Sequence, residues 1–120
     1  MDSVTTVEDL KRRVREFCEA RDWDRFHTPK ELGIGIVTEA AELLAHFRFK
    51  SDDDTRAQLE DPAKREAIEN EVADVFYFVL RLSQVLDIDV SSALEHKMRL
   101  NEARYPVERA RGRNLKYTEF

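Results

Sequence analysis

The sequence predicts an all-α, four-helix-bundle-like domain with an irregular C-terminal tail. Four segments carry apolar residues at the three- and four-residue spacing of amphipathic helices. The 120 residues include only 3 Gly and 3 Pro, so helices have few interruptions. No segment shows the alternation of β-branched and polar residues that predicts a strand. We therefore expect residues 1–120 to form a single domain, with the tail at about 106–120.

The first helix is expected to begin after Thr5 or Thr6, because acidic residues three positions later complete overlapping capping boxes. Its apolar positions end near Arg21. The next segment, Asp22–Pro29, reads as a loop with several aromatic rings. Trp23 within it is compatible with packing over a helix end and with stacking on a ligand. The residues leave both interpretations open.

The second helix is expected to start at Pro29, with Thr28 as its N-cap, and to run to about Phe47 or Arg48. Gly33 and Gly35 near its start would permit another backbone to approach closely. Its apolar positions are predicted to form one stripe, which consists of Ile36, Val37, Ala40, Leu43, Leu44 and Phe47.

A polar loop at Lys50–Thr55 and a short helical piece are expected before the third helix, Pro62–Leu86. This helix is the longest and has a strong apolar stripe. A fourth helix is predicted to begin after a cap at Asp89 or Ser91 and to end near Arg104, just before a proline.

Composition excludes several classes of protein. Hydrophobic residues make up 42% and charged residues 38% of the chain, which is too apolar for a disordered protein. No apolar run is long enough for a membrane span, and the N-terminus lacks a signal-like apolar segment. A net charge of −5 argues against a general polyanion binder. The single Cys18 is expected to be a buried thiol. A cytoplasmic location is the expectation.

Two pairs of acidic residues suggest a metal site. Glu39 and Glu42 lie three residues apart in the second helix, as Glu71 and Asp74 do in the third. An advance of about 100° per residue places each pair on a matching edge of its helix's apolar stripe. If the two helices pack antiparallel, four carboxylates converge, and they would repel without a cation among them.

Mg²⁺ prefers such oxygen ligands, with Mn²⁺ as the alternative. Acids at this spacing are also common on solvated helices, so the residues alone leave the metal site as one of two interpretations.

Three further blocks of sequence carry a resemblance to a known family. The blocks are Arg21-Asp-Trp-Asp-Arg-Phe-His-Thr-Pro29 continuing through Phe47-Arg-Phe-Lys-Ser-Asp52, then Glu71-Val-Ala-Asp-Val75, then Lys97-Met-Arg-Leu-Asn-Glu-Ala-Arg-Tyr-Pro-Val107. With the E-x-x-E pair, they resemble the MazG-like all-α NTP pyrophosphatases, and within that superfamily the dCTP pyrophosphatase family. The resemblance covers most of the chain from the first helix onward.

The resemblance implies a Mg²⁺-dependent hydrolase that converts a deoxynucleoside triphosphate, dCTP or a modified dCTP, to the monophosphate and pyrophosphate. It assigns the metal ligands to Glu39, Glu42, Glu71 and Asp74, of which Glu42 and Glu71 are the expected catalytic residues. Nucleotide contacts are implied at Trp23, His27, Phe49, Phe78, Lys97 and Asn101. It also implies a homo-oligomer, commonly a tetramer built as a dimer of dimers.

The chain departs from the family pattern around the expected base pocket. Phe49 stands where vertebrate members carry Trp, Phe78 where they carry Tyr, and Val14 where they carry His. These differences affect the expected base preference more than the metal ligands.

Several alternatives stay open. An all-α dUTP pyrophosphatase, a phosphoribosyl-ATP pyrophosphohydrolase or a broad-specificity house-cleaning enzyme would share the acidic pattern. A non-enzymatic helical binding module would need only the apolar stripes. A nucleic-acid binder would need a basic face, and only the tail is basic.

Overall fold

The computed structural model describes residues 1–120 and contains helices and no strand, which confirms the all-α prediction. The chain divides into two compact units, residues 1–87 and 88–120, and each is described by itself. The first unit contains α1 (Val7–Ala20), the 3-10 turn η1 (Asp24–Phe26), α2 (Pro29–Ala45), α3 (Asp52–Glu60) and α4 (Pro62–Val85). The second contains α5 (Val90–Arg104), α6 (Val107–Ala110) and the 3-10 turn η2 (Tyr117–Glu119).

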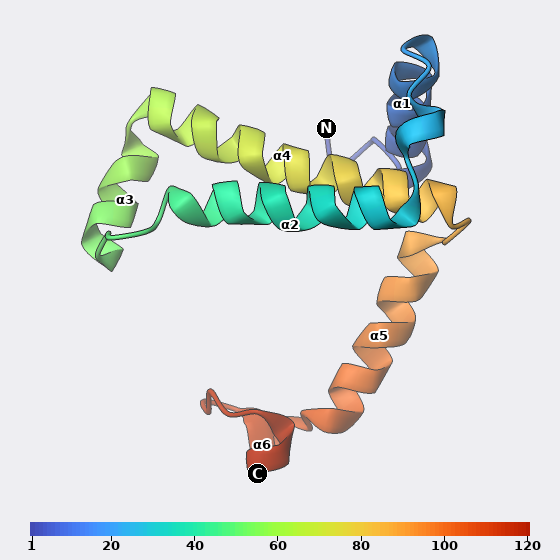
Figure 1. Ribbon diagram of the computed structural model, residues 1–120. Helices are drawn as coiled ribbons and strands as arrows, with labels where there is room; N and C mark the ends of the chain where they lie inside the picture. Colours follow the sequence, from blue (N-terminus) through green and yellow to red (C-terminus); the bar gives the residue numbers. More distant parts are fainter. The chain divides into compact units, whose positions relative to one another are not determined.

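The first unit is built on the pair formed by α2 and α4, which run side by side in opposite directions (Figure 1). Thr28 caps the start of α2 and Asp61 caps the start of α4, and each cap is followed by a proline at the first helical position. A proline fits there because that position needs no backbone N–H. The antiparallel arrangement is the one on which the predicted metal site depended.

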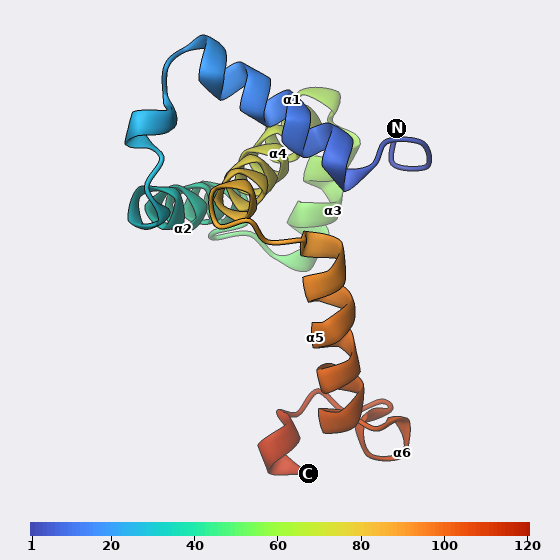
Figure 2. The same cartoon turned by 90° about the vertical axis from the view of Figure 1, so that its right-hand side faces the viewer.

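The core of this unit is small. Leu32 on α2, with Ile68 and Leu80 on α4, is buried in it, as is Cys18 on α1. The buried thiol is as predicted. Figure 2 views the α2–α4 pair end-on and shows α1 crossing α4, with which α1 makes its main contacts. α3 also packs on α4.

Gly35 allows α2 and α4 to approach each other closely. A Cβ atom placed on Gly35 would lie 2.5 to 2.8 Å from ring carbons of Phe78, whereas a Cβ on Gly33 would meet nothing within 4 Å. The expectation of close approach at Gly35 therefore holds with one change, because an aromatic side chain approaches the glycine rather than another backbone.

The apolar residues of α2 occupy two faces, and the prediction of a single stripe is wrong. Leu32 is buried against α4, but Val37 is 70% and Leu44 is 66% exposed. With Ile34, which is also exposed, these residues recur every three or seven positions and share one side of the helix. A helix that is apolar on two sides is typical of one covered by neighbours on both.

Two boundaries differ from prediction. α3 begins at Asp52, within the segment predicted as a loop, because Ser51 and Asp54 form a capping box. α2 ends at Ala45, and four residues of turn follow it. The capping box of α1, between Thr6 and Asp9, is as predicted.

In the second unit, Asp89, one of the two predicted caps, caps α5 through a bond from the Ser92 amide. The tail is less irregular than expected, since it contains α6 and η2. The ring of Tyr105 makes edge-to-face contacts with those of Tyr117 and Phe120, each at 5.8 Å between centroids. These contacts hold the end of the tail against α5. No helix in either unit combines the length and the apolar character that crossing a membrane requires.

Candidate active site

Three of the four predicted acids converge between α2 and α4. Glu39, Glu42 and Glu71 each place one carboxylate oxygen within 4.8 Å of the oxygens of the other two. Glu39 and Glu42 are brought together by their three-residue spacing on α2. Glu71 reaches them from the antiparallel α4. The sequence spacing and the helix packing together account for this cluster.

The carboxylate cluster (Glu39, Glu42 and Glu71) contains oxygens that lack partners. Oε2 of Glu39 and Oε2 of Glu71 are buried and have no hydrogen bond. A buried charged oxygen without a partner is costly. A divalent cation with oxygen ligands would satisfy both atoms and neutralise the charge. The donor set therefore fits Mg²⁺.

The electrostatics of the cluster also favour a proton or a cation. The pKa of Glu39 rises from 4.5 to about 7. The causes are a hydrogen bond to Glu42, burial, and the negative charges of Glu42, Asp74 and Glu71. A carboxyl group surrounded by like charges holds its proton more tightly. In the metal-free protein, Glu39 therefore keeps its proton to higher pH than an ordinary carboxyl group does.

Asp74, the fourth predicted ligand, lies near the carboxylate cluster but is not one of its three members. It lies three residues after Glu71 on α4 and is exposed. Its charge contributes to the raised pKa of Glu39.

His46 lies beside the cluster. Its Nε2 is 3.9 Å from Oε1 of Glu71. The backbone carbonyl of His46 accepts a bond from the buried side chain of Gln58 on α3, which fixes the end of α2. The position of His46, four residues after Glu42, continues the acidic edge of α2.

The aromatic loop, residues 22–28, lies between α1 and α2. Trp23 is 39% exposed, and its ring meets Phe17 edge-on at 5.5 Å and His27 at 6.3 Å between centroids. Trp23 therefore packs over the end of α1 and still presents part of its surface. Pro29 is about 15 Å from Glu39 along the axis of α2, at 1.5 Å per residue. Within one chain, the loop and the carboxylate cluster are separate parts of the unit.

An apolar hollow lies next to this loop. It has a volume of about 230 Å³ and is lined by Arg13, Val14, Phe17 and Tyr77, so it opens between α1 and α4. Phe17 is shared between the hollow and the packing of Trp23. Burial and a bond with Cys18 raise the pKa of Tyr77, so its hydroxyl stays neutral.

The two predicted phenylalanines have different environments. Phe78 packs edge-on against Tyr77, at 5.0 Å between ring centroids, and against Gly35. Phe49 is 91% exposed and has a φ of 63°, a left-handed conformation that is unfavourable for a bulky residue. The Arg48 guanidinium lies 4.5 Å from its ring centroid. An exposed, strained aromatic residue is typical of a position that contacts a ligand.

Lys97 and Asn101 lie on α5, in the second unit. Their four-residue spacing places them on one side of that helix. Lys97 is exposed and Asn101 is partly exposed. The first unit thus contains the acids and most of the aromatic residues, and the second contains the predicted cation and amide.

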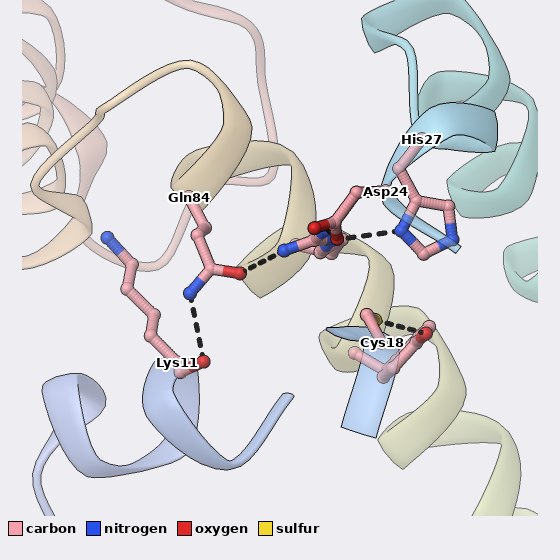
Figure 3. Close-up of polar contacts among 7 residues, drawn as sticks. Lys11, Cys18, Asp24, His27 and Gln84 are labelled. Atoms are coloured by element: carbon pink, nitrogen blue, oxygen red, sulfur yellow. Dashed lines mark hydrogen bonds and ion pairs between the residues drawn. The ribbon is translucent and has the colours of Figure 1, made fainter. Parts of the chain in front are cut away.

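A polar network that sequence reasoning missed is centred on the buried Arg81 of α4. Arg81 is 5% exposed and contacts Asp24, Gln84 and Nδ1 of His27 (Figure 3). Gln84 in turn donates to the carbonyl oxygen of Lys11 on α1, at 3.0 Å. The sequence feature that could have revealed this network is an arginine between the apolar residues Leu80 and Leu82, because a buried charge needs partners.

Comparison with known proteins gives consistent matches. The sequence model of the MazG-like family matches residues 34–120. Mouse dCTP pyrophosphatase 1 is 38% identical over 115 residues, which are 96% of this chain and 68% of the mouse protein. Human dCTP pyrophosphatase 1 is 37% identical with the same coverage.

A solved structure is also similar. The crystal structure of a pyrophosphatase from Archaeoglobus fulgidus superposes with a TM-score of 0.77 at 39% identity, over 82% of this chain and 91% of that one. The matched family segment includes α2 from Ile34 onward, the whole of α4 and the carboxylate cluster between them.

Proposed function

Because this chain belongs to the MazG-like family, we propose that it is a Mg²⁺-dependent nucleoside triphosphate pyrophosphohydrolase. The substrate is a deoxynucleoside triphosphate, dCTP or a modified dCTP, and the products are the monophosphate and pyrophosphate. The carboxylate cluster carries the proposal, because its two buried oxygens without partners suit a divalent cation. The names of the relatives, dCTP pyrophosphatase 1 and a pyrophosphatase, support the substrate class and the reaction.

Glu39, Glu42 and Glu71 would hold the metal, with Asp74 completing the set. When bound, Mg²⁺ neutralises negative charge on the phosphate oxygens and on the leaving pyrophosphate. Glu39 and Glu71 are partly buried and suited to holding the ion. A bound ion would favour the ionised form of Glu39, whose pKa is raised in the metal-free cluster.

Glu42 is the proposed base. It is exposed at the edge of the cluster, so it can reach solvent and accept a proton from the attacking water. Oxygen from that water forms a new bond to the α-phosphorus. The bond between this phosphorus and the bridging oxygen breaks, and pyrophosphate leaves with the electron pair.

The other predicted residues bind the nucleotide. Trp23 and Phe49 supply aromatic surfaces for stacking on the base, and the exposure of Phe49 favours this role. Phe78 and the hollow between α1 and α4 supply apolar surface near the loop. Lys97 pairs with phosphate as a point charge, and Asn101 bonds to sugar or phosphate.

The working form is a homo-oligomer, a tetramer made of two dimers. The second apolar face of α2, which contains Val37 and Leu44, supports self-association, because exposed apolar faces of this kind are typical of interfaces. A second copy would cover that face. It would also bring a second set of aromatic and basic residues toward each carboxylate cluster. The site of action is expected to be the cytoplasm.

The main test is pyrophosphate release from dCTP, 5-methyl-dCTP, the other dNTPs and dUTP, with and without Mg²⁺. We expect Mg²⁺-dependent release that is fastest with cytosine nucleotides. Preference for dUTP would favour the dUTP pyrophosphatase alternative, and equal rates would favour a broad house-cleaning enzyme. Absence of Mg²⁺ binding would favour a non-enzymatic helical module.

The variant that tests the metal site is Glu71→Gln, which keeps the size of the side chain and removes its charge. It is expected to fold and to lose Mg²⁺-dependent release. Glu69→Gln is the control, because Glu69 lies on the same helix, exposed and paired with Arg65. Full turnover by a folded Glu71→Gln variant would refute the assignment of the site.

A further inference from the structure

Arg81 connects three segments that are distant in the sequence. It is 5% exposed and extends from α4 to Asp24 and His27 in the aromatic loop. Its neighbour Gln84 donates to the Lys11 carbonyl on α1. The loop, the end of α4 and the middle of α1 are thereby joined by one polar network around the buried Arg81 (Figure 3).

The contact with His27 fixes where the imidazole carries its proton. Nε of Arg81 lies 2.9 Å from Nδ1 of His27. A guanidinium group can only donate hydrogen bonds. Nδ1 must therefore be the acceptor, so the single proton of the neutral ring is on Nε2. A doubly protonated ring would place an N–H against the N–H of Arg81.

The surroundings of His27 also disfavour its charged form. Burial and the positive charge of Arg81 lower the pKa of His27, against a smaller opposing effect of Asp24. Arg81 and Asp24 are the charged groups that face the ring. The imidazole is thus neutral at physiological pH.

The protonated nitrogen points away from the network. In Figure 3, the second ring nitrogen of His27 lies on the side of the ring away from the bond to Arg81. His27 is only partly buried, and Nε2 makes no hydrogen bond within the chain. The ring is next to Trp23, with 6.3 Å between centroids. A donor beside a partly exposed aromatic ring suits a planar ligand with an acceptor at its edge.

We propose that Arg81 is a positioning residue that holds His27 as a neutral imidazole with Nε2–H directed at the nucleotide. This inference rests on the proposed function. It narrows the partner of His27 to an acceptor atom, such as O2 or N3 of cytosine, and assigns to Arg81 a role in binding although Arg81 does not touch the nucleotide. Nothing in this role involves the carboxylate cluster.

The first test reads the ring directly in the nucleotide-free protein. Long-range ¹H–¹⁵N correlation spectra at pH 6.5 distinguish the two neutral forms and the charged form, and a His27→Gln variant assigns the signals. We expect the Nε2–H form of wild-type His27 to predominate. A charged ring, or the Nδ1–H form, in the wild type would overturn the proposal even if no variant folds.

Arg81→Met tests whether Arg81 is what keeps the His27 ring neutral. Met is apolar and similar in length, so it suits the buried position, and His27 is expected to become partly protonated at the same pH. Asp24→Asn is the matched control, because the amide oxygen still accepts from Arg81 and His27 should stay neutral. If Asp24→Asn changed the ring as much as Arg81→Met, general loosening of the loop would explain the result.

The second test separates binding from chemistry. The side-chain nitrogen of Gln can reach the position of Nε2, and that of Asn the position of Nδ1. His27→Gln should therefore raise the KM for dCTP less than His27→Asn does. Arg81→Met and His27→Asn should raise it about three- to tenfold, as for one lost hydrogen bond, with kcat unchanged.

A fall in kcat at constant KM, or equal KM values for the Gln and Asn variants, would contradict the proposal. Failure of the wild type to hydrolyse any nucleotide would remove the proposed function. The ¹H–¹⁵N spectra would still show whether Arg81 sets the protonation of the His27 ring.

Discussion

Replacing Gly35 with alanine should weaken the contact between α2 and α4, whereas the same change at Gly33 should not. The two residues lie two positions apart near the start of α2. A methyl group at Gly35 would lie 2.5 Å from Cε1 of Phe78, and at Gly33 it would enter open space. Comparing the two Gly→Ala variants therefore separates the effect of packing on stability from the effect of helix propensity.

The magnitude follows from two opposing effects. Ala is favoured over Gly inside a helix by about 1 kcal/mol, and this gain applies to both variants. Overpacking at a filled position costs about 1–3 kcal/mol. Phe78 cannot turn away freely, because it packs against Tyr77. Gly33→Ala should therefore be more stable than the wild type, and Gly35→Ala should be less stable than Gly33→Ala by about 1–3 kcal/mol.

Thermal unfolding followed by circular dichroism would measure the difference. At about 4 °C per kcal/mol for a domain of this size, Gly35→Ala should melt roughly 4–12 °C below Gly33→Ala. Gly35 lies one turn before Glu39, so a shift of α2 should also weaken Mg²⁺ binding in the Gly35 variant. Equal melting temperatures would refute the close packing of Phe78 on α2.

Four further outcomes are expected. The pKa of Glu39 in the folded protein, about 7, is above its ordinary 4.5. The stabilisation from its protonated form is therefore present below pH 4.5 and is lost as pH rises through about 7. Melting curves across pH 5–8 should show this loss without Mg²⁺ and its reversal with Mg²⁺. Val37→Asp or Leu44→Asp should reduce the assembly size measured by light scattering, because a charge would enter the apolar face of α2. Thr6→Ala should cost about 1 kcal/mol in urea unfolding, since it removes the capping box of α1. Cys18 is fully buried and should react with a thiol reagent only at the rate of unfolding.

Helix positions were predictable where local signals dominate. Thr28 with Pro29 and Asp61 with Pro62 start their helices as expected, because cap and proline geometry depend on neighbouring residues only. The start of α3 was missed although Ser51 and Asp54 carry the same signal as Thr6 and Asp9. Three successive aspartates in its first turn gave that segment the composition of a loop.

The site was predictable in part, for a similar reason. Acid spacing along each helix follows from helix geometry, and the antiparallel pairing then brings Glu39, Glu42 and Glu71 together. The network of Arg81 depends on contacts between residues more than fifty positions apart, which periodicity does not report. The two apolar faces of α2 were merged into one stripe because period alone does not show which face meets α4.

The order of elements along the chain has a consequence for folding kinetics. Only α3 and short turns separate α2 from α4, so closing the loop between these helices costs little chain entropy. Docking of α1 and the aromatic loop requires contacts of much longer range, such as that of Arg81 with His27. We expect the α2–α4 hairpin to form in the folding transition state and α1 to dock later. The acidic half of the site would then exist before the aromatic loop is in place.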